Sequence, residues 1–226
     1  MVFTGMIKVS DSLFEAIYND ETLQEIEQVY GPFQQPHVEL TASTGAMLNL
    51  IDNLRVKKSR RGEVVMVIPN ERGHIWLHTK AFYPQGVYRL MTGGLNVGEI
   101  PHEALHREVF EETGFEAEID RCLAVITYTL KGSDGYLPFA SYLFLTRPIR
   151  GRPRPTDPNE AITGFKAVPT KKLPDIARQL RSLEGRFLDW GIFRAVAHKV
   201  AGEYLNNVQR PYHNNKQHSR DDQHTT

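Results

Sequence analysis

Three glutamates, Glu108, Glu111 and Glu112, are spaced three and four residues apart in one predicted helix. At 100° per residue, their carboxylates flank an apolar stripe formed by Leu105 and Val109. Like charges at these spacings repel by roughly 0.2–0.5 kcal/mol per pair, and partial burial adds to that cost. A hard cation would reverse both effects, because Mg²⁺ takes carboxylate oxygens and keeps waters that a phosphate can replace. The pattern therefore favours a metal site over an ordinary solvated acidic face.

The elements that must position these acids are a strand, a glycine turn, a loop and the helix itself. The apolar segment 87–94 is predicted to be a strand that ends in Gly93-Gly94, where the missing side chains allow close approach of a phosphate. Pro101 suits the first turn of the helix, where its missing N–H costs nothing. Gly114 suits a left-handed cap at the end of the helix.

The stretch GGLNVGEIPHEALHREVFEETGF resembles the signature of the Nudix hydrolases, G-x5-E-x7-R-E-U-x-E-E-x-G-U, where U is a bulky apolar residue. Nine constrained positions within 23 residues make the match specific. All of them are filled, by Gly93, Glu99, Arg107, Glu108, Val109, Glu111, Glu112, Gly114 and Phe115.

The resemblance implies an α/β fold, namely an α/β/α sandwich around a mixed sheet, with the acidic helix packed beside the sheet. It also implies hydrolysis of a nucleoside diphosphate linked to another group, with Mg²⁺ or Mn²⁺ as cofactor. The substrate would be a small molecule of the nucleotide sugar, dinucleotide or nucleoside triphosphate class. The metal would neutralise the charge of the diphosphate and stabilise the leaving phosphate.

The resemblance assigns metal ligation to Glu108, Glu111 and Glu112. A proton acceptor for the attacking water is also needed, and Glu111 is one candidate. Glu160 is the other, because many Nudix enzymes supply a further acid from a loop before the last core strand. Glu160 lies between the TDPN segment and the predicted strand GFKAV.

The remaining signature residues are expected to hold the loop. Arg107 lies on the far side of the helix from Leu105, so we expect it to pair with Glu99 and not with a metal. Gly93 and Gly94 are expected to shape the turn, and a backbone carbonyl there is a further candidate metal ligand.

Hydrophobic periodicity divides the chain into four parts. Residues 1–60 form a predicted helical N-terminal extension, with helical spacing over 11–30 and 44–56. Residues 61–168 form the Nudix core, residues 169–208 the C-terminal helices, and residues 209–226 a disordered tail. The extension and the final helix, near 187–205, are candidates for a homodimer contact. Core strands are predicted at 63–68, 74–80, 87–94, 122–130, 141–147 and 164–168.

Composition excludes several classes of protein. With 27 basic and 27 acidic residues, the net charge is zero, which argues against a nucleic-acid-binding protein. The single Cys122 excludes an intramolecular disulfide and suits a reducing compartment. No segment approaches 18 consecutive apolar residues, so we expect a soluble cytoplasmic protein and no membrane contact.

Three functions other than hydrolysis of a small nucleotide are open alternatives. An isomerase of the isoprenoid diphosphate type needs a catalytic cysteine, but Cys122 precedes an apolar run and is interpreted as buried. A non-catalytic regulatory module needs a partner domain, for which the C-terminal part is short. An RNA cap-removing hydrolase would use the basic run from Arg55 to Arg61, which is interpreted as a solvated connector. The intact signature favours hydrolysis of a small nucleotide.

Overall fold

The computed structural model describes residues 11–56 and 60–208. Its centre is a five-stranded mixed sheet in the order β1-β5-β6-β2-β4. The strands are β1 (His37–Thr41), β2 (Gly62–Val67), β4 (Met91–Gly94), β5 (Ile119–Gly132) and β6 (Gly135–Thr146). β5 and β6 form a long antiparallel hairpin, β2 runs parallel to β6, and β4 runs antiparallel to β2. The fourth strand of this order, β2, is buried at every residue, as expected for a strand covered on both faces.

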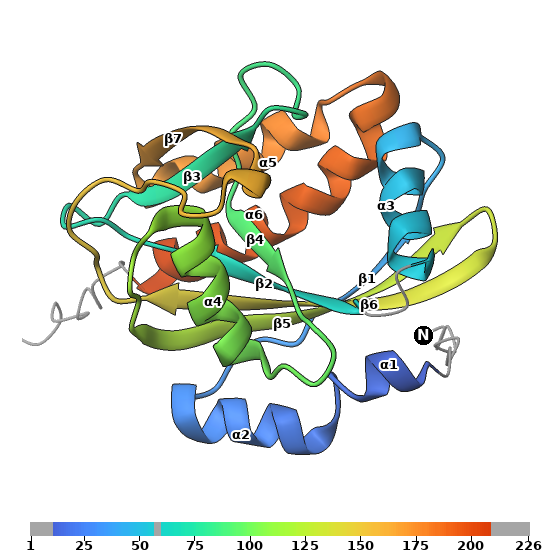
Figure 1. Ribbon diagram of the computed structural model, residues 1–226, viewed down its shortest axis with the longest axis horizontal. Helices are drawn as coiled ribbons and strands as arrows, with labels where there is room; N and C mark the ends of the chain where they lie inside the picture. Colours follow the sequence, from blue (N-terminus) through green and yellow to red (C-terminus); the bar gives the residue numbers. More distant parts are fainter. Residues whose placement is uncertain (1–10, 57–59, 209–226) are drawn as a thin grey trace, which may run out of the picture.

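Helices cover both faces of the sheet, so the fold is the α/β/α sandwich that the sequence predicts (Figure 1). Successive residues of β2 point to opposite faces, Val64 and Met66 to one and Val65 and Val67 to the other. On the first face lie α4 (Pro101–Thr113), α2 (Asp20–Tyr30) and the short α1 (Ser12–Glu15). On the second lie α3 (Gly45–Val56), α5 (Leu173–Arg181) and α6 (Leu188–Val208).

A second, two-stranded sheet joins β3 (Ile75–Lys80) to β7 (Ile162–Val168) in antiparallel register. Bridges from His78 to Arg89 and from Pro69 to Ile75 tie this sheet to the segments that flank β2 and β4. The described residues also contain three 3₁₀ turns: η1 (Pro158–Glu160), η2 (Thr170–Lys172) and η3 (Gly185–Phe187). The small sheet therefore brings the end of β3 and the start of β7 to one side of α4.

The N-terminal segment differs from its prediction, because it is not wholly helical. Three helices form as expected within the described part, but residues 37–41 form β1 and pair in parallel with 127–131 of β5. Polar and apolar residues alternate in the sequence HVELT of this segment, a pattern typical of a half-buried strand, and in the structure the side chains alternate between exposed and half-buried. The predicted tail from residue 209 lies outside the described residues.

The basic run before β2 also differs from its prediction as a solvated connector. Arg61 is buried and donates hydrogen bonds to Asp11 and to the carbonyl of Leu54, at 2.7 and 2.9 Å. Arg55 donates to the carbonyls of Asp134 and Gly135. Two arginines of the run thus tie the N-terminal helices to the sheet, and residues 57–59 lie outside the described part.

Within the described residues, no helix has the length and apolar character needed to cross a membrane. Cys122 is fully buried in the core, and burial raises the pKa of its thiol to about 12. This agrees with the interpretation of Cys122 as an inert thiol.

Candidate active site

Three carboxylates converge at the C-terminal half of α4. Ligand oxygens of Glu108, Glu111 and Glu160 all lie within 4.8 Å of one another. Glu160 arrives from η1 because the preceding loop is fastened to the end of α4. The Thr156 N–H donates to the carbonyl of Glu111 at 2.9 Å, and the Arg154 N–H donates to that of Thr113 at 2.8 Å. The structure thus brings together three of the four glutamates predicted as metal ligands or proton acceptor.

The helix that carries the acids begins and ends as the sequence predicts. Pro101 occupies its first turn, and Gly114 follows its last residue with φ of 69°, in the left-handed region that glycine adopts without strain. The N–H of Gly114 donates to the carbonyl of Phe110. Because the cap stops the helix at Thr113, the chain turns there and the carbonyls of its last turn are free for the loop that leads to Glu160.

Gly93 makes room for Glu108. A Cβ added at Gly93 would overlap the carboxyl group of Glu108, which is buried with 4% exposure. Gly94 makes room for the guanidinium of Arg60, whose Nη1 would lie 2.8 Å from an added Cβ. Neither glycine has a positive φ. In this structure, the side chains of Glu108 and Arg60 thus occupy the space beside the two glycines, and the predicted close approach of a phosphate stays a prediction.

Substituting Gly93 by alanine is expected to displace the Glu108 side chain from the acidic cluster. β4 and α4 are both well packed, so the added methyl has no room unless that side chain moves. Turnover should fall by at least about a hundredfold and the melting temperature by several degrees. Gly98→Ala in the loop between β4 and α4 is a poorer control because its φ is positive, whereas Gly45→Ala is suitable. Parental turnover of Gly93→Ala would contradict this account of the turn.

Arg107 links the loop before α4 to the acidic cluster. Its guanidinium donates to both oxygens of Glu99, at 2.7 and 2.8 Å, which is the predicted contact. The hydrogen bonds from Arg107 to Glu99 lower the pKa of Glu99. Arg107 also donates to Glu108 at 2.8 Å and to Glu111 at 3.0 Å, and the sequence does not predict these two contacts. Arg107 therefore offsets the repulsion among the acids from one side.

Lys80, at the end of β3, offsets that repulsion from the other side. Its ammonium lies 2.8 Å from Glu112 and also forms an ion pair with Glu160. His78, which shares a face of β3 with Lys80, places Nδ1 3.3 Å from the second oxygen of Glu112. Burial would raise the pKa of Glu112, but the neighbouring His78 and Lys80 lower it below its usual range. Burial lowers the pKa of His78 to about 4, so at pH 7 the positive charge beside Glu112 is that of Lys80. Glu112 is therefore a fully buried, ionised carboxylate at neutral pH.

Glu112 lies beside the acidic cluster but is not one of its members, which are Glu108, Glu111 and Glu160. Its carboxylate contacts Lys80 and His78, and it lies close enough to Glu160 to raise the pKa of that carboxyl group. The sequence predicts that Glu112 lies on the same flank of the helix as Glu108, but it does not predict which basic side chain forms an ion pair with Glu112. His78 and Lys80 are two positions apart in a predicted strand, so their side chains share one face, and this spacing is the signal that could have identified them.

The donors of the acidic cluster fit a divalent metal. All three are carboxylates, and two oxygens on opposite sides of one Mg²⁺ lie about 4 Å apart, close to the spread found here. Burial raises the pKa of Glu108 to about 7, while Arg107 opposes this shift. A buried carboxylate with a raised pKa gains from an added cation, because the cation offsets the desolvation of the charged form.

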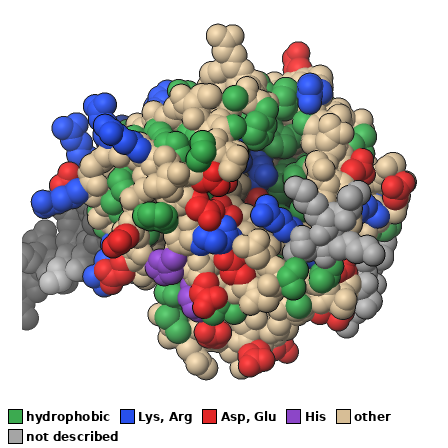
Figure 2. Space-filling model, in the orientation of Figure 1, with side chains coloured by type: hydrophobic (Ala, Val, Ile, Leu, Met, Phe, Trp, Pro, Cys, Tyr) green, Lys and Arg blue, Asp and Glu red, His purple; other side chains and the backbone are tan. Residues whose placement is uncertain are grey.

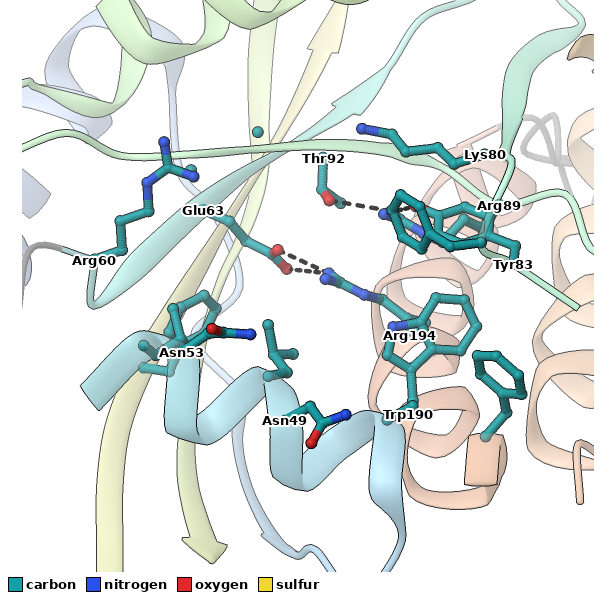
Figure 3. A pocket seen from close by; sticks show the side chains of 18 of the residues that line it. Asn49, Asn53, Arg60, Glu63, Lys80, Tyr83, Arg89, Thr92, Trp190 and Arg194 are labelled. Carbon is teal, nitrogen blue, oxygen red and sulfur yellow. Dashed lines mark hydrogen bonds and ion pairs between the residues drawn. The ribbon is translucent and has the colours of Figure 1, made fainter. Parts of the chain in front are cut away.

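A cavity of about 380 Å³ adjoins the cluster on the other side of Lys80 and Gly93. Its walls come from α3, β2, β4, the segment after β3, η3 and α6 (Figure 3). Figure 2 shows acidic side chains gathered beside a hollow whose floor and rim carry basic side chains. The cavity and the acidic cluster therefore lie side by side.

A buried polar layer forms the floor of this cavity. Glu63 of β2 accepts two hydrogen bonds from Arg194 of α6, at 2.7 and 2.9 Å, and one from Ser141 at 2.9 Å. Beneath it, His198 accepts a hydrogen bond from the Leu90 N–H at 2.8 Å and lies 2.8 Å from the carbonyl of Arg194. Burial lowers the pKa of His198 to about 3, so the ring is neutral at pH 7.

Acid is expected to destabilise the protein through His198. Its folded pKa of about 3 lies below the value of about 6.5 for an unfolded chain, so the unfolded state binds more protons between these values. The unfolding free energy should therefore decrease as pH falls from about 6.5 toward 3, by up to about 1.4 kcal/mol per pH unit from this one group. Urea titrations of His198→Gln should show a shallower pH dependence than the parent. His106→Gln, at an exposed position on α4, is the control and should retain the parental slope. Equal slopes for the parent and His198→Gln would contradict the prediction.

Comparison with known proteins identifies the family. A sequence profile of the NUDIX domain matches residues 59–191, more than half of the chain. The chain therefore belongs to the Nudix family. The match extends beyond the predicted core end at residue 168 and includes η3 and the start of α6, but it leaves out β1 and α3.

Individual relatives match over shorter stretches. An RNA pyrophosphohydrolase from Yersinia enterocolitica is 38% identical over 65 residues, which are 28% of this chain and 35% of that protein. The chain thus spans about a third of the length of the curated relatives it matches. Among solved structures, the E. coli dihydroneopterin triphosphate pyrophosphohydrolase is 15% identical with a TM-score of 0.48, over 66% of this chain and 97% of the other. A MutT NUDIX hydrolase from Burkholderia pseudomallei is 19% identical with a TM-score of 0.42, over 64% and 97%.

Proposed function

We propose that the protein is a metal-dependent pyrophosphohydrolase that cleaves the diphosphate linkage of a nucleoside diphosphate derivative. The observation that carries this proposal is the convergence of Glu108, Glu111 and Glu160 beside a basic cavity, within a member of the Nudix family. The reaction would break one P–O bond of the P–O–P bridge, with water adding to one phosphorus and the other phosphate departing.

Glu108 and Glu111 are the proposed ligands of Mg²⁺ or Mn²⁺, since Mg²⁺ commonly binds one or two carboxylates together with substrate phosphates. Such an ion would offset the charge of the diphosphate and stabilise the leaving phosphate. Arg107 holds Glu108 and Glu111 in place through Nη1 and anchors them to the loop through Glu99. Gly93 leaves the space in which the Glu108 carboxylate lies.

Glu160 is the proposed proton acceptor. Burial raises its pKa, and Lys80 opposes this shift through a hydrogen bond and its charge. A carboxylate with a raised pKa is a stronger base for taking a proton from water. Lys80 also fixes the position of Glu160, because it holds that carboxylate together with the buried Glu112.

Glu160→Gln is expected to lower kcat by about 10²-fold, within the usual contribution of a positioned base, while Mg²⁺ affinity stays near the parental value. Steady-state kinetics and calorimetric Mg²⁺ titration on the same preparations would test this. Glu118→Gln, at an exposed site before β5, is the control and should keep parental kcat. A parallel loss of Mg²⁺ affinity would assign Glu160 to the metal ligands, and parental kcat would return the base role to Glu111.

A substrate panel tests the proposed function directly. It should contain nucleoside triphosphates, nucleotide sugars, dinucleotides and dinucleoside polyphosphates, each with Mg²⁺ or Mn²⁺ and with EDTA. An RNA with a 5′-triphosphate belongs in the panel, because the chain shares a 65-residue match with RNA pyrophosphohydrolases. Release of phosphate or pyrophosphate that requires the metal supports the proposal. Turnover that survives rigorous chelation, or none on any member, would refute it.

A further inference from the structure

A second hollow, of about 370 Å³, lies between the turn that joins β2 to β3 and the chain that follows β6. Two backbone contacts hold these walls side by side. Asn70 forms a parallel bridge with Ile149, and the Ile149 N–H donates to the carbonyl of Pro69 at 2.9 Å. Among the described residues, this hollow shares no lining residue with the cavity beside the acidic cluster. It is therefore a separate feature of the surface.

Positive charge is concentrated on these two walls. Five exposed arginines form an arginine patch on the walls and the chain next to them: Arg72, Arg147, Arg150, Arg152 and Arg154. Two of the five form ion pairs, Arg147 with Glu118 at 3.3 Å and Arg150 with Glu71 at 2.9 Å. The other three have no ion pair among the described residues. Figure 2 shows basic side chains gathered at the left edge of the view, where Figure 1 places the turn between β2 and β3.

Arg152 and Arg154 lie on the outer side of an extended stretch of chain. Each precedes a proline, which confines its backbone to an extended conformation. Pro153 between them is buried, whereas both arginines are exposed. The Arg154 N–H donates to the carbonyl of Thr113 at 2.8 Å, so the stretch is fastened to the end of α4. The positive charge is thus arranged along a line and not at one point.

Trp76 of β3 adds an aromatic surface to the hollow. The residue is half-buried, and its indole Nε1 is fully buried, so the exposed part of the side chain is carbon surface of the ring. Arg72 and Arg152 also line the hollow. Aromatic faces favour flat rings, and a guanidinium binds phosphate through charge-assisted hydrogen bonds. The hollow therefore suits a flat ring that carries a phosphate.

The length of the arginine patch favours a polymer over a single small ligand. A mononucleotide in the hollow would reach Arg72 and Arg152, whereas Arg154 lies further along the chain and outside the lining. A nucleic acid strand carries a phosphate with every base and can contact all of them. Sites for single strands combine such a basic track with aromatic side chains on which bases stack. The zero net charge of the chain does not argue against this, because the distribution of charge decides where a polyanion binds.

We propose that the hollow and the arginine patch bind single-stranded nucleic acid, with one base against Trp76 and the neighbouring phosphates at Arg72, Arg152 and Arg154. This site lies outside the acidic cluster and its adjoining cavity, and it goes beyond the proposed function.

Fluorescence anisotropy of labelled single strands of about 12 nucleotides, one of RNA and one of DNA, tests the proposal in EDTA. We expect a Kd of about 10⁻⁵ M at about 50 mM salt for at least one strand. The affinity should fall as salt rises with a log–log slope of about −2, since each of three phosphate contacts contributes about −0.7 for a single strand. Inorganic polyphosphate should compete about tenfold less well per phosphate, because it offers no ring to Trp76.

Variants locate the site. Arg152→Gln and Arg154→Gln are exposed substitutions, and each should weaken binding severalfold and reduce the salt slope by about 0.7. Arg181→Gln on α5 makes the same charge change at an exposed position outside the patch and should bind as the parent does. Trp76→Leu should weaken strand binding about tenfold with little effect on polyphosphate, and Trp76→Phe should retain part of the parental affinity. If Trp76→Leu fails to fold, the two arginine variants decide the question.

Several outcomes would overturn the proposal. These are no binding of either strand at low salt, parental binding by both arginine variants, and equal competition by polyphosphate. Binding to vesicles of acidic phospholipid without binding to either strand would assign the arginine patch to a membrane surface and would also overturn it.

Discussion

Glu108→Gln is expected to lower turnover by about a thousandfold while the protein stays folded. Glu108 is the most buried member of the acidic cluster, and its carboxylate fills the space left by Gly93. Glutamine has the same shape and keeps one oxygen, but it has no charge with which to hold a divalent ion. Metal-assisted stabilisation contributes several kcal/mol, and each 1.36 kcal/mol changes the rate about tenfold. Kinetics at saturating Mg²⁺, with a thermal melt in EDTA, would measure both effects.

The control for this variant lies on the same helix. Glu103 is exposed in the first turn of α4, so Glu103→Gln makes the same chemical change away from the cluster and should keep parental turnover. Because burial raises the pKa of Glu108, its neutral replacement should melt in EDTA no lower than the parent does. Parental activity of Glu108→Gln would remove Glu108 from the proposed metal ligands.

Glu112→Gln is expected to have its main effect on stability. In EDTA, the unfolding free energy should fall by about 3 kcal/mol, because removal of one partner from a buried ion pair leaves the other charge poorly compensated. Lys80 is 9% exposed and would keep only Glu160 as a charged partner. The sequence alone places Glu112 among acids that repel one another and does not indicate this buried ion pair with Lys80. Urea denaturation in EDTA measures the change.

A double variant separates charge from packing. Lys80→Met combined with Glu112→Leu should recover part of the lost stability, since apolar replacement of a buried pair is often neutral or stabilising. The rise in melting temperature on adding Mg²⁺ should persist in Glu112→Gln, because Glu112 is engaged by Lys80 and is not one of the three carboxylates of the cluster. Loss of that rise would assign Glu112 to the metal ligands, as the signature implies.

The sequence predicts the elements around the signature well because their signals are local. Pro101 and Gly114 mark the ends of α4, and Arg107 contacts Glu99 as expected from its place on the helix. Within the segment 11–30, Asn19 is the N-cap of α2, where its side chain accepts a hydrogen bond from the Thr22 N–H. Each of these features depends on residues fewer than ten positions apart.

The remainder of the site depends on residues far apart in the chain. Lys80 and Glu112 are 32 positions apart, and Glu63 and Arg194 are 131 apart. A basic or acidic residue in a strand pattern gives no indication of which partner will face it across the fold. The sequence therefore identifies the acids of the cluster, including Glu160, but neither the cations that surround them nor the cavity between α3 and α6.

β1 has a further consequence for any shortened form of the protein. This strand occupies the outer edge of the large sheet, where it pairs with residues 127–131 of β5. A chain that began at residue 59, where the family match begins, would lack β1 and α3 together. The backbone groups of β5 would then be open to pairing with another molecule, which is the usual route from an exposed sheet edge to aggregation. A shortened form that keeps this edge covered must therefore begin at or before His37, well ahead of residue 59, where the family match begins.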